Sequence, residues 1–138
     1  MKQLLRAIAA LAFFCLASLA AAGQRDAEIE ALVDKAVEER TFLVSCSALS
    51  EYLYTSTLKY WEFDRKNAVM PLLVKLGVAP EVFVRLIKKT ESKNLMVKIN
   101  GTAGELISYC RDNQDLMKKL YSLGGVSLPR DLGKMLGQ

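Results

Sequence analysis

Histidine is absent from the 138-residue sequence, and with it the commonest general base and a usual metal ligand of proteins. A Ser-His-Asp or Cys-His catalytic group is therefore impossible. The sequence also lacks a glycine-rich phosphate loop, a Cys-x-x-Cys pair and a calcium loop. The acid pairs Glu38 with Glu39 and Asp112 with Asp115 lie on predicted solvent-facing sides of helices, where solvated charge explains them. We expect a protein that is not an enzyme and that needs no cofactor or metal.

Glycine and proline are scarce as well, and neither occurs between residues 24 and 70. Good helix formers fill this segment, so it is predicted to form one long helix or two. From residue 29 to residue 37 the apolar side chains keep a helical period, with charged residues on the other face. Beyond Arg40 the apolar period loses phase, which predicts a bend or a short break over residues 39–42.

Two short apolar helices are predicted next. The first is capped by Asn67, tolerates Pro71 in its first turn and stops at Gly77. The second has Pro80 at its first position. Both are expected to pack across the longer helices.

A further long helix is predicted to open with the capping-box pattern of Thr102 and Glu105 and to run to about residue 123. Gly124 and Gly125 would end it, and one or two helical turns would follow Pro129. The sequence therefore predicts an all-α fold, a single compact domain of about five helices.

The first 22 residues have the layout of a secretory signal peptide. Lys2 and Arg6 precede an apolar run that ends in small residues, with a predicted cleavage site after Ala22. The run is short and a polar segment follows it, which disfavours the alternative of an uncleaved membrane anchor. We expect a periplasmic or secreted protein whose helical domain spans residues 23–138.

Without residues 1–22 the chain has 116 residues, and its net charge falls from +4 to +2 because only Lys2 and Arg6 leave. This near balance gives no electrostatic reason to expect nucleic acid as a partner, and we expect no membrane association after cleavage. Cys15 leaves with the signal peptide, so Cys46 and Cys110 remain as a pair. In an exported protein such a pair is expected to form a disulfide, here an interhelical one. Two separate buried thiols are the alternative.

The segment from residue 45 to residue 63 is unusually aromatic, and treating it as one helix divides it into two apolar strips. The strip that contains Cys46 is predicted to face the core. A second strip consists of Tyr54, Leu58 and Trp61, and two explanations are open for it. Either another helix covers it, or it stays partly exposed as a homodimer or partner interface. The predicted core-facing strip comprises Cys46, Leu49, Tyr52, Leu53, Ser56, Thr57, Tyr60 and Phe63.

The stretch KINGTAGELISYCRDNQDLMKKLY resembles the C-terminal part of periplasmic immunity proteins that neutralise type VI secretion amidase effectors. The earlier stretch VSCSALSEYLY is similar to the upstream cysteine helix of that family, whereas residues 64–97 show no resemblance. The family implies an all-helical dimer that plugs the active-site cleft of a peptidoglycan amidase. The positions that carry the resemblance are Lys98, Gly101, Leu106, Ile107, Cys110, Asp112, Leu116 and Leu120.

The family inserts a protruding loop into the amidase, and residues 91–102 are the best candidate for it. The expected polar contacts are Lys93, Asn94 and Lys98, with Leu95 and Met96 as apolar contacts. An ordinary connecting loop is the alternative for this segment. Two other functions remain open for the whole chain. One is a periplasmic chaperone of the acid-stress type, and the other is an accessory subunit of an envelope complex.

Overall fold

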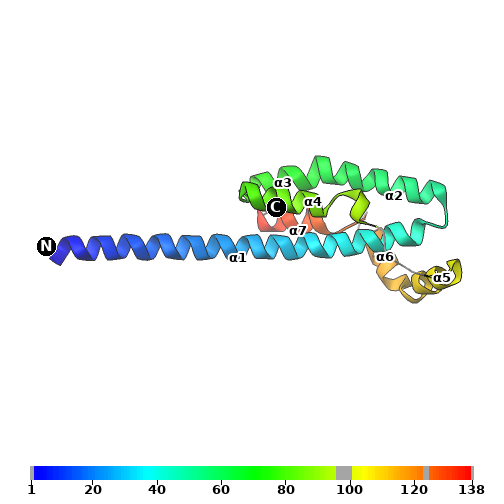
Figure 1. Ribbon diagram of the computed structural model, residues 1–138, viewed down its shortest axis with the longest axis horizontal. Helices are drawn as coiled ribbons and strands as arrows, with labels where there is room; N and C mark the ends of the chain where they lie inside the picture. The colour runs from blue at the N-terminus through cyan, green and yellow to red at the C-terminus, as the bar shows by residue number, and fades with distance from the viewer. Residues whose placement is uncertain (1, 96–100, 123–124, 138) are drawn as a thin grey trace.

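Helix α1 (Lys2–Ser47) is the longest element, and the other helices gather along its C-terminal half (Figure 1). The computed structural model describes residues 2–95, 101–122 and 125–137. The predicted bend over residues 39–42 is wrong, because α1 continues through it. The apolar period fades there because Glu39 and Arg40 are buried too, and their partners lie on other elements.

The chain reverses after α1, and helix α2 (Glu51–Asp64) returns beside it (Figure 1). Ser50 caps α2, since its side chain accepts a hydrogen bond from the backbone N–H of Leu53 at 3.4 Å. A π-helical segment, η1 (Arg65–Val69), then leads directly into α3 (Met70–Lys75). Asn67 is therefore not the predicted cap.

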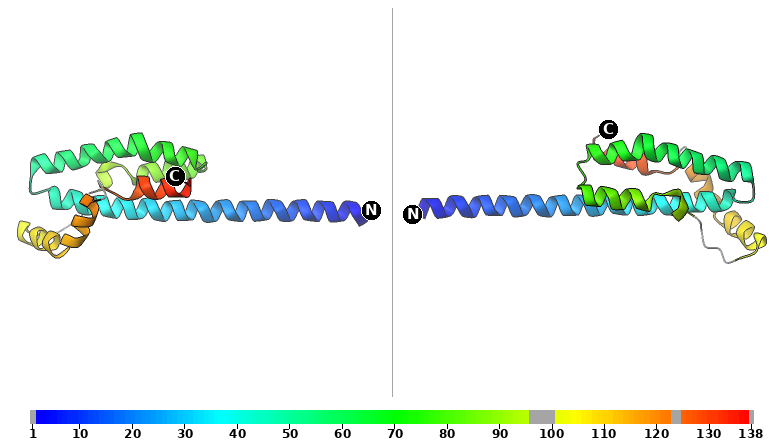
Figure 2. Two further views of the ribbon diagram at one scale, coloured as in Figure 1. Left: turned by 180° about the vertical axis from the view of Figure 1, so that it is seen from behind. Right: turned by 45° about the horizontal axis from the view of Figure 1, so that its top comes forward.

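The predicted end of α3 is confirmed, because Gly77 has a φ of 65° that favours glycine. Helix α4 (Pro80–Lys89) follows, with Pro80 in its first turn as predicted. It runs along α1 rather than across it (Figure 2). Ion pairs join the two helices: the side chain of Glu30 binds Arg85 at 2.9 Å and Lys89 at 2.7 Å.

The predicted long C-terminal helix is two helices, α5 (Ala103–Asp112) and α6 (Gln114–Ser122). Its predicted capping box is confirmed, since Thr102 and Glu105 exchange side-chain and backbone hydrogen bonds. The helix breaks at Asn113, whose side-chain amide donates to the carbonyl of Tyr109 at 2.8 Å. Figure 1 shows α5 projecting on the side of α1 away from α2. Helix α7 (Leu128–Met135) contacts α1 and α3.

Two clusters of buried side chains hold these helices together. The main core surrounds Trp61, and a smaller cluster comprises Phe42, Leu43 and Leu120. The main core contains Ile29, Val33, Ala36, Val44, Trp61, Val69, Leu73, Leu76, Leu86, Leu95, Val126, Leu128 and Leu132. The all-α fold is confirmed, since the described residues contain no strand. In the same residues no helix is long and apolar enough to span a membrane.

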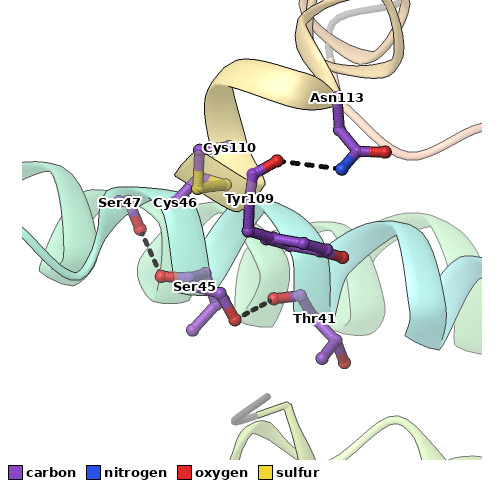
Figure 3. The surroundings of a disulfide bond; sticks show 8 residues. Thr41, Ser45, Cys46, Ser47, Tyr109, Cys110 and Asn113 are labelled. Carbon is purple, nitrogen blue, oxygen red and sulfur yellow. Dashed lines mark hydrogen bonds between the residues drawn. A yellow bond between two sulfur atoms is a disulfide. The ribbon is translucent and has the colours of Figure 1, made fainter. Parts of the chain in front are cut away.

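The predicted disulfide is confirmed. Cys46 near the end of α1 bonds to Cys110 in α5, with the two Cα atoms 5.7 Å apart (Figure 3). Next to it, the ring of Tyr109 meets the ring of Phe42 edge to face, with the centroids 5.7 Å apart. No residue of α5 is buried, so the bridge is the main tie between this helix and the rest of the protein.

Candidate protein-binding face

Helix α2 presents a row of large apolar side chains to solvent. Tyr52, Tyr60 and Phe63 are exposed by 79%, 68% and 64%, and they share one side of the helix. Leu49 and Leu53 extend this row toward the turn between α1 and α2, and both are about half exposed. We call these five residues the aromatic face. Soluble proteins rarely expose such a set of large apolar side chains unless another molecule covers it.

The aromatic face was predicted to be core, and that prediction is wrong. The prediction takes Cys46 to Phe63 as one helix. In the structure α1 ends at Ser47 and α2 starts at Glu51. The turn between them interrupts the helical period, so the side of α2 that faces the core differs from the side expected for one continuous helix. Of the remaining predicted core residues, Cys46, Ser56 and Thr57 are partly buried.

The strip of Tyr54, Leu58 and Trp61 is covered by neighbouring helices. This agrees with the explanation that another helix covers the strip. Trp61 is fully buried, and its indole Nε1 donates a 2.6 Å hydrogen bond to the carbonyl of Thr90. Tyr54 and Leu58 are partly buried and pack against the same core. In this structure Trp61 is therefore unavailable to a partner, contrary to the second explanation.

The expected contact residues of the candidate loop, residues 91–102, differ in their exposure to solvent. Lys93 is exposed and pairs with Glu91 at 2.7 Å, so it could meet a partner. Leu95 is fully buried in the core, which corrects its expected role as a contact. Asn94 ends the short 3-10 turn η2 (Ser92–Asn94). Met96 and Lys98 lie outside the described residues.

Two hollows open beside the aromatic face, and Tyr60 and Asp64 line both of them. The larger, of about 500 Å³, lies along α2 and includes Lys59 and Phe63. The smaller, of about 280 Å³, lies between α1, α2 and α6 and includes Arg40 and Tyr121. Sequence reasoning missed both hollows. The smaller one forms where helices distant in sequence meet, and the larger one depends on which side of α2 faces solvent.

A buried cation lies at the smaller hollow. The side chain of Arg40 is only 4% exposed, and its Nη2 lies 3.5 Å from Oδ2 of Asp64. Burial lowers the pKa of Arg40, against the opposing charges of Asp64 and Glu39. Burial likewise raises the pKa of Asp64, although the charge of Arg40 opposes this. Desolvation thus works against the charged form of both partners.

Glu39, the residue before Arg40, is a second buried charged side chain. Its carboxylate accepts hydrogen bonds from the backbone N–H of Ser127 at 3.0 Å and from the Ser127 hydroxyl at 3.2 Å. The expectation that Glu39 faces solvent is therefore wrong, whereas Glu38 is exposed as expected. Glu39 links α1 to the start of α7, which gives it a structural role.

The described residues contain no cluster of histidine, cysteine or carboxylate side chains that could hold a metal ion. Comparison with protein-family models, with curated proteins and with solved structures finds no match to this chain. The aromatic face and its two hollows are therefore the features that point to a function.

Proposed function

We propose that this chain is an exported protein that acts by binding another protein through the aromatic face of α2. The observation that carries the proposal is the exposure of Tyr52, Tyr60 and Phe63 on one side of a single helix. Tyrosine and phenylalanine supply large contact areas with few rotatable bonds, so they are effective interface anchors. The Cys46–Cys110 disulfide supports the proposal, because it is compatible with an oxidising compartment.

Within this class, we propose an immunity protein that inhibits a peptidoglycan amidase delivered by type VI secretion. The resemblance of the two cysteine-containing segments supports this choice. An inhibitor also needs a rigid surface, since a preorganised surface loses little entropy on binding. The aromatic face lies on a helix held against α1, and it replaces the loop of residues 91–102 as the main proposed contact. Exposed Lys93 remains a proposed polar contact.

The test begins with a search for an amidase reading frame beside the gene of this chain, and that amidase is then targeted to the periplasm and co-expressed with the protein. The wild-type protein is expected to prevent lysis, and Tyr60→Asp with Phe63→Asp is expected to restore it. Loss of two anchors should weaken binding by about 100-fold or more. Val74→Asp with Val84→Asp is the matched control, because these exposed valines lie on α3 and α4.

The outcomes distinguish the proposed immunity function from the proposed contact through the aromatic face. Unabated lysis despite abundant folded wild-type protein would refute the immunity function. Full protection by the Tyr60→Asp, Phe63→Asp variant would refute the aromatic face as the contact. A homodimer through the same face is the alternative, and light scattering over a range of concentrations would reveal it as a doubled mass that the same variant abolishes.

A periplasmic acid-stress chaperone is the second candidate, and the ion pairs between α1 and α4 favour it. Lys89 and Arg85 lower the pKa of Glu30 to about 2, so the pairs persist until strongly acidic pH and then fail. Protonation of Glu30 would remove one tie between α1 and α4, whose apolar face includes Phe83 and Leu86. Circular dichroism and client-aggregation assays at about pH 2 decide the matter. Unchanged structure and no client protection would exclude a chaperone.

A further inference from the structure

The smaller hollow beside the aromatic face has a cation at its inner side. The residues around it come from three helices and from the segment before α7. Thr57 and Asp64, which accept hydrogen bonds from the Arg40 guanidinium, both line the hollow. Gly125 lines it too, and a Cβ atom there would come within 3.4 Å of Arg40 Nη2. Arg40 therefore borders the hollow, with its Nη2 on the side of Gly125.

Arg40 is poorly supplied with hydrogen-bond acceptors for a buried cation. A guanidinium has five N–H donors. Nη1 donates to the carbonyl of Thr57 and Nη2 to the carboxylate of Asp64, and both distances are 3.5 Å. These exceed the usual range of about 2.7–3.2 Å, so the bonds are weak. Nε is buried and has no hydrogen-bond partner among the described residues. A buried cation is normally paired and hydrogen-bonded, so this guanidinium has donors left for one more acceptor.

The hydrogen-bond donors around the hollow favour an oxygen anion as that acceptor. Arg40 and Asp64 balance each other at the hollow itself. Lys59 adds a second cation at the adjoining hollow, which shares Tyr60 and Asp64 with the first. The buried carboxylate of Glu39 also acts on the charge of Arg40, so these four charges already balance, and it is the unfilled guanidinium donors that favour an anion. Tyr60 and Tyr121 border the opening, and their phenol groups can donate hydrogen bonds to an oxygen anion.

We propose that the hollow between α1, α2 and α6 binds a carboxylate group through the Arg40 guanidinium, with Tyr60 and Tyr121 flanking it. Charge-assisted hydrogen bonds to a carboxylate are short and strong, and arginine can form two of them to one carboxylate. The inference rests on the proposed function for the source of this group, an aspartate or glutamate side chain of the protein partner. That side chain would enter the hollow while the aromatic face covers the surrounding apolar surface.

The first experiment uses acetate as the probe and the Arg40 side chain as the reporter. The exported protein is purified from the periplasm and titrated with sodium acetate, and the Arg40 Nε–H signal is followed by NMR. A saturable shift is expected with acetate and none with acetamide, its neutral counterpart. Sodium chloride at the same ionic strength is the control for an adventitious ion only. No shift with acetate, or an equal shift with chloride, would overturn the proposal.

Two substitutions test the assignment without removing Arg40 from the core. Asp64→Asn removes the competing anion, so acetate should bind several-fold more tightly. Tyr121→Ala removes an exposed side chain at the opening and should weaken acetate binding several-fold. Asp112→Asn is the matched control, because Asp112 is exposed on α5 away from the hollow, and it should change nothing. Unchanged acetate affinity in both Asp64→Asn and Tyr121→Ala would contradict a site at this hollow.

A competition experiment separates this inference from the proposed function. Acetate at saturating concentration should weaken partner binding at least several-fold if a side chain of the partner occupies the hollow. Acetate binding without competition would assign the hollow to a free carboxylate instead. Partner binding with no acetate shift would refute the hollow and leave the aromatic face standing. An acetate shift in a protein that fails to protect against the amidase would refute the immunity function alone.

Discussion

The guanidinium carbon of Arg40 lies 5.1 Å from the centre of the Trp61 ring, so a cation of α1 faces the aromatic centre of the core on α2. Such a contact is worth more in a dry interior than at a surface, about 2 kcal/mol. Trp61 also reaches the end of α4, since its Nε1 donates to the carbonyl of Thr90. One side chain thus ties three helices together.

Trp61→Phe should lower the free energy of unfolding by about 2 kcal/mol or more. The substitution leaves the Thr90 carbonyl without its donor in a buried place, and it also removes part of the ring that faces Arg40. Urea unfolding followed by circular dichroism gives the value. Tyr52→Phe, on the exposed side of the same helix, should change it by less than about 0.5 kcal/mol. Equal stabilities for the two variants would show that Trp61 does not hold the core as described.

The sequence predicted those features that depend on neighbouring residues. The capping box at Thr102 and the stop at Gly77 are local, and both are confirmed. The Cys46–Cys110 pairing was predictable because only two cysteines follow the predicted signal peptide. The all-α class followed from helix-forming composition, which needs no knowledge of tertiary contacts.

The direction of α2 was not predictable in the same way. The turn before it contains neither glycine nor proline, and its main signal is the N-cap Ser50 followed by an acidic residue. A prediction that omits this turn exchanges the core-facing and solvent-facing sides of α2, and so it places Tyr60 in the core. The buried positions of Glu39 and Arg40 depend on Ser127 and Asp64, which are distant in sequence. No local pattern reports such pairing.

Replacing both bridge cysteines, Cys46→Ser with Cys110→Ser, should lower the free energy of unfolding by about 4 kcal/mol in the chain-entropy model. The disulfide joins residues 64 positions apart, so its removal frees a long loop in the unfolded chain. The local effect should be largest in α5, which has no buried residue of its own.

Hydrogen exchange checks the local part of this prediction. In the double variant the amides of α5 should lose most of their protection through local opening, while those of α2 around Trp61 should lose only as much as the free energy of global unfolding falls. The α2 amides serve as the internal control, because the main core does not include the bridge. Equal loss of protection in both helices would indicate that the bridge holds the whole fold.

The ion pairs of Glu30 should make stability depend on pH in the acid range. Hydrogen bonds from Lys89 and Arg85 lower the pKa of Glu30 from 4.5 to about 2 in the folded protein, and Lys89 has the larger effect. A lowered folded-state pKa means that the contribution is complete above about pH 4.5 and is lost as the pH falls toward 2. The midpoint temperature of wild-type protein should therefore exceed that of Glu30→Gln at pH 6, and the gap should close near pH 2.

Glu28→Gln is the control for this pH series, because Glu28 is exposed on the same helix. Its midpoint temperature should follow that of the wild type at every pH. A gap between wild type and Glu30→Gln that stays constant from pH 6 to pH 2 would contradict the ion-pair explanation.

Two adjacent glutamates of α1 should respond differently to the same substitution. Glu39→Ala removes the carboxylate that accepts hydrogen bonds from the Ser127 backbone N–H and hydroxyl, and it leaves these buried donors unpaired. An unpaired buried donor costs about 1–3 kcal/mol, so the free energy of unfolding should fall by that amount. Glu38→Ala, at an exposed position, should change it by less than about 0.5 kcal/mol. Urea unfolding measures both, and exchange of the α7 amides should rise only in Glu39→Ala. Equal effects of the two substitutions would show that Glu39 does not anchor α7.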